Sequence, residues 1–269
     1  MNTDIILYFI AYFILYSFAG WLLESVSKSV MEKKLVNSGF LTGPLCPIYG
    51  FGAVIMMLCL SFLKDKPILL FFAAFFILSI WEYIVGVVLE KLFKTKYWDY
   101  SHLKFNIQGR VCLKNSIYWG LLGVAFICFV QPFVESYMVQ VPKDILLYVD
   151  ITAMIIFVID IVISVTTMSS FNTAINKINE LGDNIKEKIA ELKSTRGKHK
   201  DDDVKLQRKN TIKVIRQLRF KQAKLKLKMY KQANRLKKAF PSMKSETISN
   251  FLNQKFDLKK LKDNLKNKE

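Results

Sequence analysis

The chain has 269 residues, of which 52% are hydrophobic, and its mean hydropathy is +0.22 although its formal net charge at pH 7 is +18. High apolarity and high charge are compatible only when they belong to different segments. Residues 1–170 hold 12 basic and 11 acidic side chains, whereas residues 171–269 hold 28 and 11. The composition therefore excludes a uniformly soluble chain and predicts two domains: a transmembrane domain over 1–170 and a basic helical tail over 171–269.

Five apolar blocks recur in the first domain, each close to the roughly 20 helical residues that cross a bilayer core about 30 Å thick. They run over Ile5–Val26, Ile48–Leu63, Pro67–Val88, Ser116–Val134 and Ile145–Thr166. The first block lacks the basic start and the cleavage site of a signal peptide, so we expect it to remain a membrane helix. The second is short, and we expect broken backbone buried within the protein just before it. The predicted fold is all-α and polytopic, with about five transmembrane helices.

The distribution of lysine and arginine predicts the orientation. Basic residues gather in the loops after the first and third blocks and in the tail, whereas the alternate loops hold only Lys64 and Lys66, then Lys143. Because short basic loops stay in the cytoplasm, we expect the N-terminus outside and the tail inside.

This orientation places four carboxylates, those of Glu24, Glu82, Glu90 and Asp160, in the inner half of the bilayer. Glu24 and Glu90 lie near helix ends, where they can meet interfacial water or pair with nearby lysines. Glu82 and Asp160 lie deeper, where an unpaired charge costs at least a few kcal/mol. We expect a paired or functional role for these two, with Arg110 as the counter-ion because it is the only arginine before residue 170.

Two loops on the cytoplasmic side have unusual compositions. Residues 37–52 hold four glycines and two prolines, a density typical of tight turns and close backbone approach. Residues 97–113 combine aromatic rings with a carboxylate, an imidazole, amides and a guanidinium, which is typical of a membrane interface or of a polar cleft. The predicted loop-shaping residues are Gly39, Gly43, Pro44, Pro47, Gly50 and Gly109, and the predicted interfacial aromatics are Trp21, Trp98, Tyr100 and Trp119.

Several gapped motifs occur in a fixed order along residues 1–135. They are Gly20-Trp21-x-x-Glu24, Gly39-Phe40-Leu41-x-Gly43-Pro44-x-Cys46-Pro47-Ile48-Tyr49-Gly50-x-Gly52, Glu82-Tyr83, Trp98-Asp99-Tyr100-Ser101, and Phe105-Asn106-x-x-Gly109-Arg110-x-Cys112-Leu113 with Ser116 and Trp119-Gly120. With these motifs the chain resembles the bacterial CmpB-like family of ABC-transporter permeases, and Arg235–Pro241 in the tail also resembles a stretch common in that family. The chain departs from the family pattern at Ser38, where an arginine usually follows the asparagine, and at Gln131, where a histidine is expected before the proline.

The resemblance implies a permease-like transport component in a bacterial plasma membrane. The predicted transport-site residues are Glu24, Tyr49, Glu82, Asp99, Asn106, Arg110 and Asp160. Carboxylates at low dielectric can exchange protons near neutral pH, so they would permit proton or cation coupling. The sequence has no GxxxxGK[ST] motif, so any ATPase would be a separate polypeptide. Five spans are few for a complete pathway, which favours a homo- or hetero-oligomer.

An enzyme is the less favoured class. The four cysteines form no CxxC pair and there are only two histidines, so we expect neither a metal nor a cofactor. An intramembrane hydrolase that uses Glu24 or Glu82 with Arg110 on a lipid headgroup stays as an alternative.

The tail shows helical periodicity from Ile175 to Leu192 and from Val204 to Ala239, with a turn predicted around Gly197 and residues 201–203. We expect a basic helical hairpin that binds anionic lipid headgroups, or a coiled coil with a solvated face. A membrane scaffold that recruits a partner through this hairpin is the second functional hypothesis, whereas nucleic-acid binding has no motif to support it. Residues 242–269 are too polar to form a core, and we expect a short terminal helix or a mobile end there.

Overall fold

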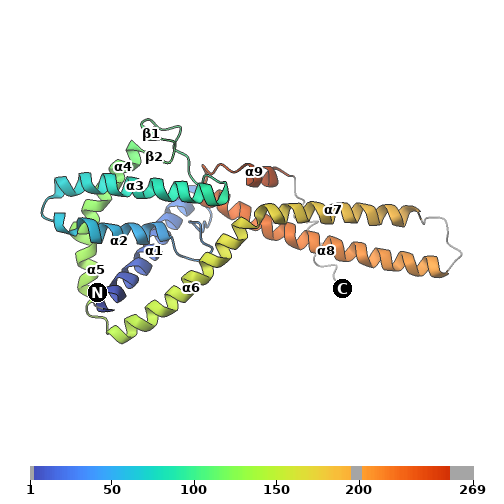
Figure 1. Cartoon of the computed structure of the whole chain (residues 1–269), viewed down its shortest axis with the longest axis horizontal. Coiled ribbons are helices and arrows are strands. Elements are labelled where there is room, and N and C mark those ends of the chain that lie inside the picture. Colours follow the sequence, from blue (N-terminus) through green and yellow to red (C-terminus); the bar gives the residue numbers. More distant parts are fainter. Residues whose placement is uncertain (1–2, 195–201, 255–269) are drawn as a thin grey trace. The chain divides into compact units, whose positions relative to one another are not determined.

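The computed structural model describes residues 3–194 and 202–254, which fold into two compact units. Among the described residues, one unit, here called the membrane unit, comprises 3–166 and Arg235–Ser245, and the other, the tail unit, comprises 167–194, 202–234 and 246–254. Helices dominate both, which confirms the all-α polytopic fold (Figure 1).

Four helical segments of the described chain are long and apolar enough to cross a membrane. They are α1 (Thr3–Glu32), α3 (Pro67–Phe93), the continuous run of α4 (Leu113–Ala125), η2 (Phe126–Val130) and α5 (Gln131–Met138), and α6 (Lys143–Ser169). The fifth apolar block forms α2 (Pro47–Leu60) and the 3₁₀ turn η1 (Ser61–Leu63). The 14 residues of α2 extend about 21 Å, so this block is helical as predicted but shorter than a full span.

Proline explains two features of these helices. Pro47 and Pro67 occupy the first positions of α2 and α3, where a missing N–H costs nothing. Pro132 lies inside the α4 to α5 run and has no N–H to donate to the carbonyl of Cys128. Cys128 lies in the π-helical segment η2, where the regular α-helical pattern of hydrogen bonds is interrupted and the carbonyl does not need the missing donor.

Within the membrane unit α1 packs on α2, and α3 packs on α4. Gly50 of α2 lies so close to α1 that an added Cβ would be 2.1 Å from Ser17 Oγ. Large apolar side chains cover the exposed faces of the helices, as expected where lipid replaces water.

A short hairpin follows α3 and was not predicted. Its strands, β1 (Asn106–Ile107) and β2 (Val111–Cys112), are antiparallel with Asn106 opposite Cys112. Gln108 and Gly109 have φ values of 51° and 66°, so the turn between the strands uses left-handed backbone.

The tail unit contains α7 (Phe171–Ser194), most of α8 (Asp202–Ala239) and α9 (Glu246–Asn253). Gln222 Nε2 of α8 donates to the Ile178 carbonyl of α7 at 2.9 Å, so the two helices lie side by side (Figure 1). Phe171 and Phe251 meet with ring centroids 5.7 Å apart. The predicted short terminal helix is present as α9, but its Ile248 and Phe251 are buried, so the expectation that this stretch forms no core is wrong there. Residues 255–269 and most of the predicted turn at 197–203 lie outside the described residues.

Candidate functional site

The membrane unit contains a partly open cavity of about 420 Å³, here called the aromatic cavity. Its walls come from α1, α2, α3, α4, the loops beside them and the Ala239–Ser242 segment. Most of the lining is apolar, and only three of the lining residues carry a charge. The lining residues are Glu24, Lys28, Gly39, Phe40, Cys46, Pro47, Ile48, Tyr49, Gly52, Met56, Leu78, Trp81, Glu82, Val85, Leu89, Tyr97, Trp98, Tyr100, Trp119, Leu122, Ala239, Phe240, Pro241 and Ser242.

Glu82 of α3 is the most enclosed acid of this cavity, with 5% of its surface exposed. Trp119 Nε1 donates to its Oε2 at 2.9 Å, and the Tyr100 hydroxyl donates to its Oε1 at 3.2 Å. The ion pairs found among residues 3–194 and 202–254 do not include Glu82. Two neutral donors therefore hold this carboxylate inside an apolar wall.

Glu24, the other acid of the cavity, forms an ion pair with a lysine. Lys28, one turn further along α1, pairs with it at 2.5 Å and also donates to Ser38 Oγ and to the Ala239 carbonyl. Ser38 is fully buried, and its N–H donates to Ser25 Oγ at 3.1 Å. At this departure from the family pattern, the positive charge beside position 38 comes from Lys28.

The second departure, Gln131, is also buried. Its Oε1 accepts a hydrogen bond of 2.7 Å from the Tyr16 hydroxyl, which joins α5 to α1. Both departures thus take part in contacts within the membrane unit.

The loop over residues 37–46 is held on two sides. Asp160 of α6 accepts hydrogen bonds from the N–H groups of Thr42 and Gly43 at 3.1 and 2.8 Å. On the other side, Arg235 donates to the carbonyls of Gly39, Phe40 and Leu41 at 3.2, 2.9 and 2.8 Å. A carboxylate therefore binds the loop's donors while a guanidinium binds its acceptors.

Two of the predicted loop-shaping and aromatic residues stabilise the same loop. Gly39 has a φ of 87°, a backbone conformation that favours glycine. Trp21 Nε1 donates to the Asn37 side chain at 2.7 Å, so Trp21 supports the loop and does not line the cavity. Pro47 begins α2 immediately afterwards.

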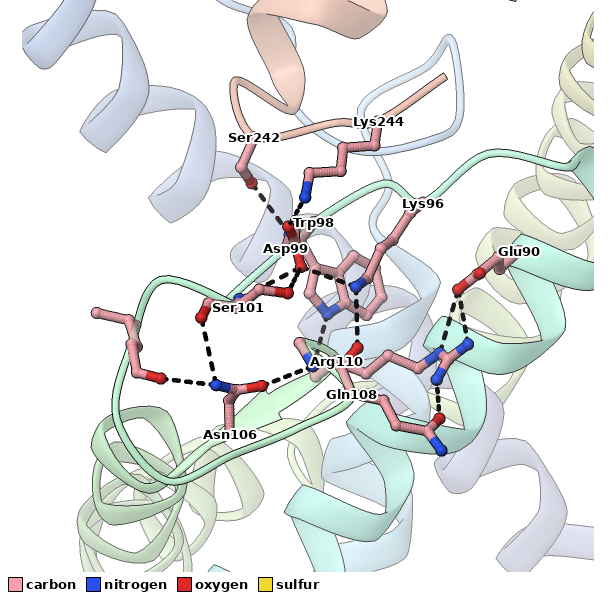
Figure 2. A network of polar contacts seen from close by, with 12 residues as sticks. Glu90, Lys96, Trp98, Asp99, Ser101, Asn106, Gln108, Arg110, Ser242 and Lys244 are labelled. Carbon is pink, nitrogen blue, oxygen red and sulfur yellow. Dashed lines mark hydrogen bonds and ion pairs between the residues drawn. The ribbon is translucent and has the colours of Figure 1, made fainter. Parts of the chain in front are cut away.

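Asp99 organises the polar network beyond α3 (Figure 2). Its carboxylate accepts from Lys96 Nζ at 2.7 Å, from Ser101 Oγ at 2.6 Å and from Lys244 Nζ at 2.5 Å. Burial alone would raise the pKa of Asp99, but the hydrogen bonds from Lys244, Lys96 and Ser101 outweigh it and hold this pKa well below its usual range. Asn106 stabilises the hairpin turn by accepting the Gly109 N–H at 2.9 Å.

Arg110 belongs to this network as well. Its guanidinium binds Glu90 Oε2 through two nitrogens at 2.8 and 3.2 Å, and its carbonyl accepts from Trp98 Nε1 at 2.9 Å (Figure 2). The prediction that Arg110 is the counter-ion of Glu82 or Asp160 is therefore wrong. Glu90 lies two turns after Glu82 on α3 and takes the guanidinium instead.

The segment Arg235–Ser245 contributes to this site, and the sequence did not predict that it would. Its Lys244 exchanges two backbone hydrogen bonds with Lys96, and the Asp99 N–H donates to Ser242 Oγ at 3.3 Å. Phe240 stacks edge-on against Tyr97 with centroids 5.1 Å apart. The one available signal was the resemblance of Arg235–Pro241 to a stretch common in the family.

The structure brings together only part of the predicted site. Eight predicted residues line the aromatic cavity, namely Glu24, Gly39, Pro47, Tyr49, Glu82, Trp98, Tyr100 and Trp119. Asp99, Asn106 and Arg110 lie in the hairpin network, and Asp160 lies against the 37–46 loop. Lys28, Trp81 and the Phe240–Ser242 wall are cavity residues that were not predicted.

These features define a polytopic helical membrane protein with a largely apolar cavity between its helices. The chain belongs to the family described as Putative ABC-transporter type IV (ABC_trans_CmpB), whose model matches residues 11–165. This match confirms the resemblance seen in the motifs. No curated protein matched the chain. No solved structure matched it either.

Proposed function

We propose that this chain is the membrane-embedded component of an ATP-driven transporter and that the aromatic cavity is its cargo site. The observation that carries the proposal is a cavity of about 420 Å³ built from four helices, with one buried carboxylate that has only neutral partners. Clefts of roughly 300–1,000 Å³ with apolar walls and a few polar groups are typical of sites for small molecules. Membership of a transporter-type family supports the same reading.

The placement of the cavity suits access from one side of the membrane. Loop 37–46, the hairpin loop and Arg235–Ser245 contact one another or share partners, so they gather at one end of the membrane unit. Under the orientation expected from the basic loops, this end is cytoplasmic and the cavity lies near it.

ATP hydrolysis would come from a second polypeptide, since the sequence has no P-loop motif. The test is affinity purification of the full chain from its own host in mild detergent, with co-purifying proteins identified and the mass of the complex measured. The proposal expects an ATPase in fixed stoichiometry, and a tagged membrane protein of another family serves as the control for background. A chain that purifies without any ATPase, over several detergents, would contradict the proposal.

A transport component and a scaffold that acts through its tail should differ in how they respond to shortening of the tail. Deleting all of 171–269 would remove a wall of the cavity, because Ala239–Ser242 line it. Asp160 and Arg235 both bind the 37–46 loop, so a short linker in place of residues 173–230 can join the two parts of the membrane unit. A transport component keeps its cavity and its ligand binding in that variant, whereas a scaffold loses its partner.

A further inference from the structure

We propose that the aromatic cavity binds an amphipathic organic cation, whose charged group pairs with Glu82 and whose apolar body lies against the tryptophan rings. The inference deepens the proposed function, because it names the class of cargo for the same cavity.

The charges of the cavity favour a cation. Its lining contains three charged residues, and Lys28 is already paired with Glu24. Glu82 is left with Trp119 and Tyr100, and an indole N–H is a donor only, so Oε2 acts as an acceptor. A buried carboxylate without a cation costs several kcal/mol in an apolar environment. A cationic group beside Glu82 would offset that cost, whereas an anion would add to it.

The walls favour an apolar or aromatic body. Three tryptophans line the cavity, and each indole N–H has a protein acceptor: the Ile48 carbonyl for Trp81, the Arg110 carbonyl for Trp98, and Glu82 for Trp119. Since these N–H groups are occupied, the tryptophans have ring surface to offer a ligand. Indole rings attract cations that approach within about 6 Å of the ring centre, and the attraction is stronger when water is excluded.

The size and the donor set argue against a bare metal ion as the occupant. A cavity of about 420 Å³ holds an organic molecule, and its lining is mostly carbon. Residues 3–194 and 202–254 contain no group of three or more His, Cys, Asp or Glu side chains arranged to hold a metal ion. The shared chemistry is therefore an ammonium or phosphonium group on an apolar body, from a soluble solute or from a lipid headgroup.

The test is equilibrium binding of radiolabelled tetraphenylphosphonium to the purified full chain in detergent, with triphenylphosphine oxide as a neutral competitor of similar shape. We expect saturable binding that triphenylphosphine oxide displaces at least tenfold more weakly than unlabelled tetraphenylphosphonium. Glu82→Gln removes the charge and keeps the shape, and we expect it to weaken binding at least tenfold. Glu90→Gln is the matched control, because Glu90 is on the same helix but pairs with Arg110 outside the cavity lining; we expect a change of less than twofold.

Equal affinity of wild type and Glu82→Gln would overturn the proposal, and so would equal competition by the neutral analogue. The second comparison uses the wild-type chain alone, so it holds even if Glu82→Gln fails to fold. Competition by benzyltrimethylammonium would indicate a soluble cation, and competition by short-chain phosphatidylethanolamine would indicate a lipid headgroup, with phosphatidylglycerol as the control. If neither compound displaces tetraphenylphosphonium, the proposal is also overturned. If these binding tests fail but an ATPase co-purifies with the chain, the proposed class of cargo is wrong and the proposed function still holds.

Discussion

Replacing Arg235 with alanine should release the Arg235–Ser245 segment from the membrane unit. The guanidinium makes its two shortest hydrogen bonds, 2.8 and 2.9 Å, to the carbonyls of Leu41 and Phe40. Hydrogen bonds that involve a charged group contribute about 1.5 kcal/mol each at the lower end of measured values. Their loss amounts to about 3 kcal/mol, or about a 150-fold increase in the population that is locally open.

Hydrogen exchange measured by mass spectrometry on the full chain in detergent reads this local opening directly. We expect peptides that cover residues 37–46 and 240–245 to exchange about 100-fold faster in Arg235→Ala than in the wild type. Arg219→Ala is the matched control, because Arg219 is exposed on the same helix, and its effect on these peptides should be negligible. Unchanged exchange in both regions of Arg235→Ala would refute the reasoning that the guanidinium fastens this segment.

Three further substitutions have expected outcomes that thermal unfolding in detergent can check. Gly109→Ala should destabilise the chain by at least about 1 kcal/mol, because Gly109 has a φ of 66° and an added Cβ would lie 2.2 Å from Asp99 Oδ1. Gly52→Ala in α2, where an added Cβ would lie no closer than 3.8 Å to its neighbours, should be neutral or stabilising; equal effects would contradict this. Asp160→Ala should cost about 1–3 kcal/mol, because the Gly43 N–H loses its acceptor while the Thr42 N–H keeps Ser164 Oγ at 3.1 Å, and a wild-type melting temperature would contradict it. Because the pKa of Asp99 is lowered in the folded chain, its stabilising effect should be complete at neutral pH and fall once the pH drops below about 4, so the difference between the wild type and Asp99→Asn should shrink in acid; a difference that grows in acid would contradict this sign.

The helices of the membrane unit were predictable because an apolar run of about 20 residues has few alternatives to a membrane helix. Every predicted apolar block is helical, and the shortness of Ile48–Leu63 was evident from its residue count. The bounds differ mainly where helices extend past the bilayer core, as α1 does to Glu32. The hairpin of two-residue strands carries too little periodicity for any sequence pattern to reveal it.

Eight of the 24 residues that line the aromatic cavity were predicted, mainly because acids and aromatic rings are conspicuous in an apolar sequence. The partners of these residues were not. Arg110 was predicted to pair with Glu82 or Asp160, but its guanidinium forms an ion pair with Glu90. Arg235 binds a loop that is 196 residues away in the sequence, and only tertiary contacts can show such a pairing.

ATP hydrolysis by the complex purified from host membranes and reconstituted into lipid vesicles tests the central claim most directly. We predict that vanadate-sensitive ATP hydrolysis co-purifies with the tagged wild-type chain. Tetraphenylphosphonium should increase the hydrolysis rate of the wild-type complex and leave that of the Glu82→Gln complex unchanged. A wild-type preparation with no hydrolysis above that of the tagged control protein would contradict the account of this chain as the membrane component of an ATP-driven transporter.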